Sequence, residues 1–209
     1  MLLLPAQNRK KLPTMRLIIN LVLLVIVAAL VYVLIDSIRE PIAFKNERDK
    51  REDAVVDRLR DLRRGQELYR TISGGEFASN WDDYKRVLST GQIPYVKVIG
   101  DPDDPNFQGE VTYDTTYSSA ADSIKTLGWD LNEMVLIPFG NGKMFDVQAD
   151  TLSYQKTLVN VVEVGTKRSS FMGRFADEKY KRYDARYDPN SVIKFGDMNK
   201  PSTAGNWER

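Results

Sequence analysis

The acidic segment at residues 101–106, with the sequence DPDDPN, comes closest in residue type to a metal site. Calcium takes roughly six to eight oxygen ligands and accepts closely spaced carboxylates. The run departs from the EF-hand pattern because Pro105 interrupts it and no glycine stands at its sixth position. Asp-Pro dipeptides are equally ordinary in solvated turns. We therefore assign no metal ligand, and a bound cation stays open as an alternative.

Other catalytic chemistry is restricted by composition. The chain contains no histidine and no cysteine, which removes the commonest general base, the thiolate nucleophile and the usual ligands of transition metals. The glycines at 140 and 142 flank Asn141 without a P-loop around them, so they predict a turn rather than a phosphate cradle. No pair of carboxylates suited to glycan hydrolysis can be identified. We expect a non-enzymatic protein without a cofactor.

The balance of charge bears on partners. Thirty basic residues face twenty-nine acidic ones, whereas a protein that binds nucleic acid usually has a basic excess. In residues 171–209, Tyr180, Tyr183 and Tyr187 alternate with lysine and arginine, a pattern that could stack on bases, but nearby acids neutralise it. We expect an extended aromatic and charged arm that covers this domain or a partner. Neither nucleic acid nor a small-molecule substrate is expected.

These residues must be positioned by a chain with a membrane-spanning segment near its start. Residues 17–35 carry no charge, proline or glycine, and Asn20 is their only strongly polar group. As a helix they would extend about 28 Å, close to the hydrocarbon thickness of a bilayer. Residues 1–16 are basic and contain no acid, which predicts an uncleaved signal anchor with a cytoplasmic N-terminus. Asn20 and Tyr32 are candidates for contact with a partner helix in the membrane.

Residues 36–73 predict a charged helical stalk. Val55, Leu59, Leu62 and Gln66 recur at spacings of four, three and four residues and form one stripe along the helix, which Tyr69 continues. The stripe could pack on the chain's own sheet, or it could form a short coiled coil with a second copy in which Gln66 lies in the seam. Both alternatives stay open at this point.

Residues 74–170 predict an α+β domain. One short helix is expected within residues 76–92, with Asn80 as its N-cap, and a second over residues 118–127. Strands are expected at 93–99, 111–117, 134–139, 143–148 and 156–164, and the third and fourth are joined by an Asn-Gly turn. We expect a mostly antiparallel sheet of about four to five strands packed against the long helix.

Two resemblances add to this reading. The segment LRRGQELYRTISGGEFASNWDDYKRVL resembles the helix end of type IV pilins and pseudopilins, which implies a pilin-like arrangement of helix and sheet. No glycine precedes Gly65, so the processing and polymerisation of that family do not carry over. The stretches REPIAFKNERDKREDAVVDRLRDLRRGQELY and VIKFGDMNKPSTAGNWE resemble uncharacterised single-pass envelope proteins of Bacteroidota. That resemblance implies a periplasmic C-terminal domain.

Together these features predict a structural or accessory subunit of an envelope complex, anchored in the inner membrane and contacting envelope proteins and possibly itself. One alternative is an accessory subunit of a TonB-type proton-channel motor or secretion machine. Another is a peptidoglycan- or glycan-binding module that uses Trp81, Trp129, Trp207 and the tyrosines. The candidate partner contacts are Asn20, Tyr32, Val55, Leu59, Leu62, Gln66, Tyr180, Tyr183 and Tyr187.

Overall fold

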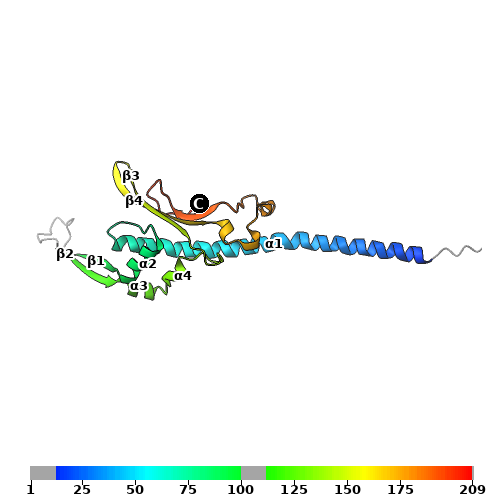
Figure 1. Ribbon diagram of the computed structural model, residues 1–209, viewed down its shortest axis with the longest axis horizontal. Helices are drawn as coiled ribbons and strands as arrows, with labels where there is room; N and C mark the ends of the chain where they lie inside the picture. The colour runs from blue at the N-terminus through cyan, green and yellow to red at the C-terminus, as the bar shows by residue number, and fades with distance from the viewer. Residues whose placement is uncertain (1–12, 100–111, 209) are drawn as a thin grey trace, which may run out of the picture. The chain divides into compact units, whose positions relative to one another are not determined.

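The structure is a computed structural model that describes residues 13–99 and 112–208 (Figure 1). The acidic segment 101–106 and most of the basic tail 1–16 lie outside the described residues. The helices are α1 (Pro13–Ile72), α2 (Trp81–Thr90), α3 (Ala120–Thr126) and α4 (Leu131–Met134), with 3-10 turns η1 (Arg168–Ser170), η2 (Gly173–Phe175) and η3 (Glu178–Arg182). The strands are β1 (Gln92–Ile99), β2 (Thr112–Ser119), β3 (Asp146–Tyr154), β4 (Thr157–Lys167) and β5 (Val192–Gly196).

The chain divides into two units between Asn46 and Glu47, within helix α1. In the first unit the predicted apolar helix is confirmed. Its side chains are exposed along residues 17–35, and none of its most apolar stretch is buried. Among the described residues, α1 is the one helix long and apolar enough to span a membrane. It is therefore compatible with a single-pass protein or a signal anchor.

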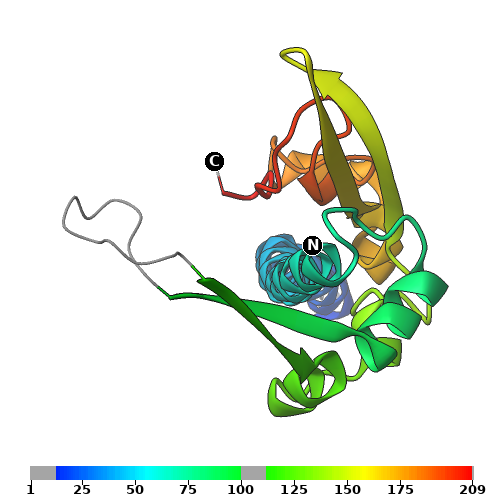
Figure 2. The ribbon, with the colours of Figure 1, turned by 90° about the vertical axis from the view of Figure 1, so that its left-hand side faces the viewer.

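The second unit has the expected α+β class but not the expected single sheet. Strands β1 and β2 form a two-stranded antiparallel sheet, and β3, β4 and β5 form a separate antiparallel sheet in that order. Figure 2 shows the two sheets on different sides of the second half of α1. The prediction of one sheet with four to five strands was wrong because the helix separates the two groups of strands.

The two short helices begin where their caps predict. The side chain of Asn80 accepts a hydrogen bond from the Asp83 N–H at 2.8 Å, and α2 starts at the next residue. Ser119 accepts from the Asp122 N–H at 3.4 Å and begins α3. A side-chain oxygen at the N-cap satisfies one of the free N–H groups of the first helical turn.

The prediction of a hairpin with strands at 134–139 and 143–148 was wrong, because these two segments do not form the paired strands expected. Asp130 caps the short helix α4 by accepting from the Asn132 N–H at 2.8 Å, so Met134 ends a helix instead of starting a strand. Asn141 and Gly142 do have the left-handed φ angles of 53° and 79° that the turn predicts. The chain on either side of them forms only an isolated bridge, and the hairpin β3–β4 turns instead at residues 155 and 156.

The core of this unit is built on the stripe of α1 that the sequence singled out. Val55, Leu59 and Leu62 are fully buried, and the ring of Tyr69 stacks at 6.4 Å on that of Tyr84 from α2. Gly65 allows this approach, because a Cβ there would lie 1.8 Å from the Tyr84 hydroxyl. The helix face predicted from periodicity is therefore the face that holds α2 against α1.

The C-terminal segment 171–209, expected as an extended arm, contains η2, η3 and the unpredicted strand β5. Its start and its end are bound to α1. Arg51 donates to the Phe171 carbonyl at 2.5 Å, and Glu208 pairs with Arg63 at 2.7 Å. The arm thus covers its own domain, which was one of the two alternatives drawn from the sequence.

Candidate functional site

Four of the predicted partner contacts, Val55, Leu59, Leu62 and Gln66, lie in the interior of the second unit, each with no exposed surface. The amide of Gln66 donates to the Ala78 carbonyl at 3.1 Å and accepts from the Ala78 N–H at 2.9 Å. The polar group that could have lain in a coiled-coil seam therefore has both partners in its own chain. Of the two alternatives for the stripe, the structure shows packing within the chain's own domain. These four residues therefore belong to the core and do not form a docking surface.

The aromatic residues of the arm are also largely interior. Tyr180 and Tyr187 are 5% and 2% exposed, while Tyr183 is half-buried. The Tyr187 hydroxyl donates to the Phe175 carbonyl at 2.6 Å, and burial raises the pKa of Tyr187 to about 12. The basic side chains lie over the rings, with Arg182 at 4.5 Å from the Tyr183 centroid. Tyr180 and Tyr187 are therefore not a contact surface for a partner. Arg174, Lys179 and Arg182 each lie over an aromatic ring of this segment.

The two candidate contacts in the apolar helix, Asn20 and Tyr32, are exposed, unlike the buried residues of the stripe and the arm. Asn20 and Tyr32 are both exposed on the first half of α1, and Tyr32 is 73% exposed. A polar amide in lipid gains from a partner that satisfies it. The expected contact of these residues with a partner helix stays a prediction.

The three tryptophans do not form an exposed binding platform. Trp81 is 7% exposed, and its indole N–H donates to the Phe145 carbonyl at 2.7 Å. Trp129 and Trp207 are half-buried. The sequence-based expectation that these rings stack on a glycan has no support from their positions.

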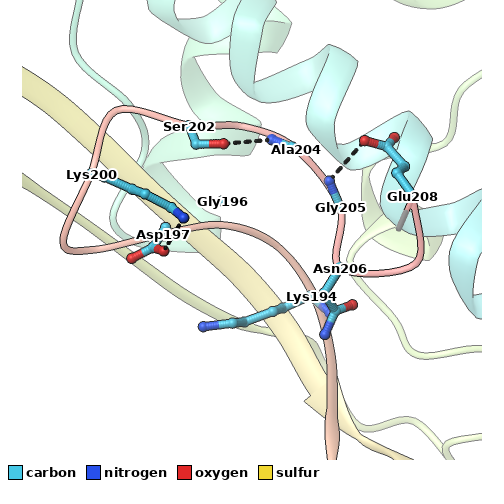
Figure 3. A pocket seen from close by; sticks show the side chains of 9 residues that line it. All are labelled: Lys194, Gly196, Asp197, Lys200, Ser202, Ala204, Gly205, Asn206 and Glu208. Carbon is cyan, nitrogen blue, oxygen red and sulfur yellow. Dashed lines mark hydrogen bonds and ion pairs between the residues drawn. The ribbon is translucent and has the colours of Figure 1, made fainter.

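A hollow of about 300 Å³ lies beneath the C-terminal loop (Figure 3). Its charged groups are paired. Lys200 lies 3.5 Å from Asp197, and Lys194 lies 2.6 Å from Glu163. The lining residues are Lys194, Gly196, Asp197, Lys200, Ser202, Ala204, Gly205, Asn206 and Glu208.

The hydrogen bonds of this hollow close a loop and do not activate a nucleophile. Ser202 accepts from the Ala204 N–H at 3.3 Å, and the Asn199 N–H lowers the pKa of Asp197. Glu208 accepts from the Gly205 N–H at 3.1 Å, and its pairing with Arg63 lowers its pKa. Within residues 13–99 and 112–208, no group of three or more acidic side chains could hold a metal ion. The hollow has neither a nucleophile next to a base nor an uncompensated charge for a ligand.

The most unusual surface of the second unit is the ribbon of β1 and β2. Its strand residues pair directly along their whole length, from Gln92 with Ser119 to Ile99 with Thr112. Beyond Ile93 and Pro94 every residue of β1 is exposed, including large apolar ones. The exposed large apolar residues are Tyr95 (54%), Val96 (57%), Val98 (48%), Ile99 (50%), Tyr113 (67%) and Tyr117 (65%).

The two faces of this ribbon differ in charge. Side chains alternate between faces along a strand, and directly paired residues share a face. Lys97 and Asp114 pair with each other and therefore lie on the same face. The opposite face, which we call the uncharged face, carries only uncharged side chains: Pro94, Val96, Val98, Tyr113, Thr115 and Tyr117.

Sequence reasoning predicted both strands of the ribbon but missed their exposure. The first stretch, IPYVKVI, places apolar residues on both faces, whereas VTYDTTY places its tyrosines on one face and Thr112, Asp114 and Thr116 on the other. A strand half-buried against a core usually alternates apolar and polar residues. Neither pattern distinguishes an exposed ribbon from a covered one, because apolar residues on a strand normally indicate a buried face.

Comparison with family models, with curated proteins and with solved structures finds no match for this chain. The arguments about function therefore rest on the residues and geometry described above.

Proposed function

We propose that this protein is a non-enzymatic single-pass protein of the inner membrane, with its N-terminus in the cytoplasm and its C-terminal domain in the periplasm. It acts as a structural or accessory subunit of an envelope protein complex. The observation that carries this proposal is the run of exposed apolar and aromatic side chains along β1 and β2.

An exposed apolar ribbon is a candidate interaction site. The largest apolar patch on a monomeric protein is commonly about 300–600 Å² and is often functional. A lone two-stranded ribbon is also only marginally stable in water and gains from a further packing layer. Both arguments support a partner that covers the ribbon.

The paired charges of the C-terminal hollow support a non-enzymatic role. Lys194, Lys200, Asp197 and Glu208 each have a partner within the chain. General acid–base or nucleophilic chemistry requires a group poised for proton transfer next to open space. The charged groups of this hollow instead hold the C-terminal loop in place by pairing within the chain.

A glycan-binding module is a second candidate, because Tyr113 and Tyr117 lie exposed on the same face of β2. Aromatic rings in a row can stack on sugar rings as they do on other flat ligands. Retention of the full chain on insoluble cell-wall material, and its loss in Tyr113→Ser/Tyr117→Ser, would favour this candidate over a protein partner.

The main proposal is tested by purifying the full chain from membranes in mild detergent and determining its native mass. We expect a stoichiometric assembly, with another copy or with another protein, that Tyr113→Ser/Tyr117→Ser abolishes. The matched control is Thr112→Ser/Thr116→Ser on the opposite face, which should leave the assembly intact. A chain that purifies only as a monomer would contradict the proposal.

A further inference from the structure

We propose that the uncharged face of the β1–β2 ribbon binds the same face of a second copy of this chain, so that two ribbons stack as a two-layered sheet. This inference rests on the proposed function, since it names the partner that covers the ribbon. It goes beyond that proposal by identifying the contact surface and its symmetry.

The first argument is self-complementarity. A two-fold symmetric contact uses the same patch on both copies, so the patch must tolerate facing itself. The uncharged face meets this requirement because no like charges would oppose each other across it. Lys97 and Asp114 lie on the other face and would stay in water. A charged partner would find no complementary group on the uncharged face.

The second argument is the geometry of stacking. Two sheets pack face to face about 10 Å apart, with their inner side chains interdigitating. A two-fold axis along the strands gives two ribbons that point in the same direction. Antiparallel pairing at the outer edge of β2 would make the ribbons point in opposite directions. Face-to-face stacking about this axis therefore keeps the two ribbons parallel.

The third argument is the size of the contact. Val96, Val98, Tyr113 and Tyr117 together present on the order of 400 Å² of apolar surface in each copy. A symmetric pair would then bury about 800 Å² in total, which is less than the roughly 1,200 Å² of a standard specific interface, so the contact alone is a weak one. Anchoring both copies in one membrane raises their effective concentration, which allows a contact of this size to form.

Cysteine cross-linking tests the face directly, because the natural chain has no cysteine. Val96→Cys and Thr115→Cys are a directly paired couple on the uncharged face, and Lys97→Cys and Asp114→Cys are the matched couple on the opposite face. Each single variant of the full chain is oxidised in native membranes. We expect disulfide-linked homodimers from the first couple in at least about ten-fold greater yield than from the second.

Equal yields from the two faces, or no homodimer from either, would overturn the inference. An adduct of the first couple with a different protein would also overturn it, yet it would support the proposed function. A native mass that shows a monomer, together with no adduct of any kind, would contradict both.

A charge-swap experiment answers the objection that a variant has misfolded. Val98 is half-exposed, so either charge is tolerated in the single chain. Val98→Glu alone and Val98→Lys alone should each lose most of the homodimer, while co-expression of the two should restore a mixed dimer. Failure of the mixed pair to assemble would overturn face-to-face contact, since opposite charges at this position should attract each other across it.

Discussion

The two sheets of the second unit use similar residues for different purposes. In the three-stranded sheet Val161, Val162, Val164, Ile193 and Phe195 are at most 3% exposed. In the two-stranded ribbon Val96, Val98 and Tyr113 are about half to two thirds exposed. A valine-rich segment therefore predicts a strand, but the covering elements decide whether its side chains stabilise the fold or stay available for a contact.

The edges of the two sheets also differ. Strand β5 is bordered by the C-terminal loop, where the Gly196 N–H donates to the Ala204 carbonyl at 3.1 Å and the Asn206 N–H to the Lys194 carbonyl at 3.0 Å. These bonds occupy an edge that would otherwise be open to another strand. Within residues 13–99 and 112–208, no segment pairs with the outer edge of β1 or β2.

The largest expected effect separates a core position from a ribbon position. Leu59→Ala removes a fully buried side chain and should lower the free energy of unfolding by about 3 kcal/mol. Val98→Ala removes an exposed one and should cost less than about 0.5 kcal/mol in the single chain. Denaturant titration of the full chain in detergent, followed by tryptophan fluorescence, measures both. Similar losses for the two variants would break the distinction between the sheets.

The next effect concerns the buried amide of the α1 stripe. Gln66→Leu keeps most of the volume but leaves the N–H and carbonyl of Ala78 without their partners. Each buried backbone group left unsatisfied is costly, so we expect a loss of about 2 kcal/mol in the free energy of unfolding. Glu67→Gln, at the exposed neighbouring position, is the control and should change little. A neutral Gln66→Leu would show that water or a rearranged loop satisfies Ala78.

A comparable or slightly smaller effect is expected at Gly65. A methyl group there would collide with the Tyr84 hydroxyl at 1.8 Å, and overpacking of this kind costs about 1–3 kcal/mol. Gly65→Ala should therefore lower the melting temperature. Adding Tyr84→Phe removes the colliding oxygen and should recover part of the loss, since the next contact is 3.0 Å away. If Tyr84→Phe worsens the Gly65→Ala variant, α2 does not approach α1 as described.

The smallest effect is a pH dependence within the arm. The pKa of Tyr187 is raised from 10.0 to about 12, so its neutral form is favoured in the folded state. The stability it contributes is fully present below about pH 10 and is lost as the pH rises through about 12. Tyr187→Phe should cost about 1 kcal/mol at neutral pH through the lost bond to Phe175. It should also reduce the loss of stability between pH 10 and 12. An unchanged alkaline profile would show that other groups control it.

Local chemistry explains which parts of the structure could be predicted. Asn80 and Ser119 cap helices because their side chains act within one turn, and the period of Val55, Leu59 and Leu62 identifies a buried helix face. The assignment of strands to two sheets depends on contacts far apart in sequence, which no local pattern contains. Residues 134–139 had strand-like composition, but Asp130 favoured a helix just before them.

The candidate site was harder to predict for the same reason. Tyr180 and Tyr187 lie in a highly charged stretch of sequence that is typical of an exposed arm, yet the arm folds back and buries both rings. Tyr113 and Tyr117 had the composition of a sheet interior, yet no described element covers them. Exposure is a property of the assembled fold, and the charge pattern of one strand does not determine it.

The most direct test of the account measures assembly and stability on the same sample. Tyr113→Ser/Tyr117→Ser, purified as the full chain in mild detergent, should have the mass of a single chain, whereas the natural protein should be assembled. Its melting temperature, compared at a concentration where the natural protein is also dissociated, should fall by no more than about 2 °C. An assembly that persists while the melting temperature falls as far as in Leu59→Ala would contradict the account, because the ribbon would then be part of the fold and not its contact surface.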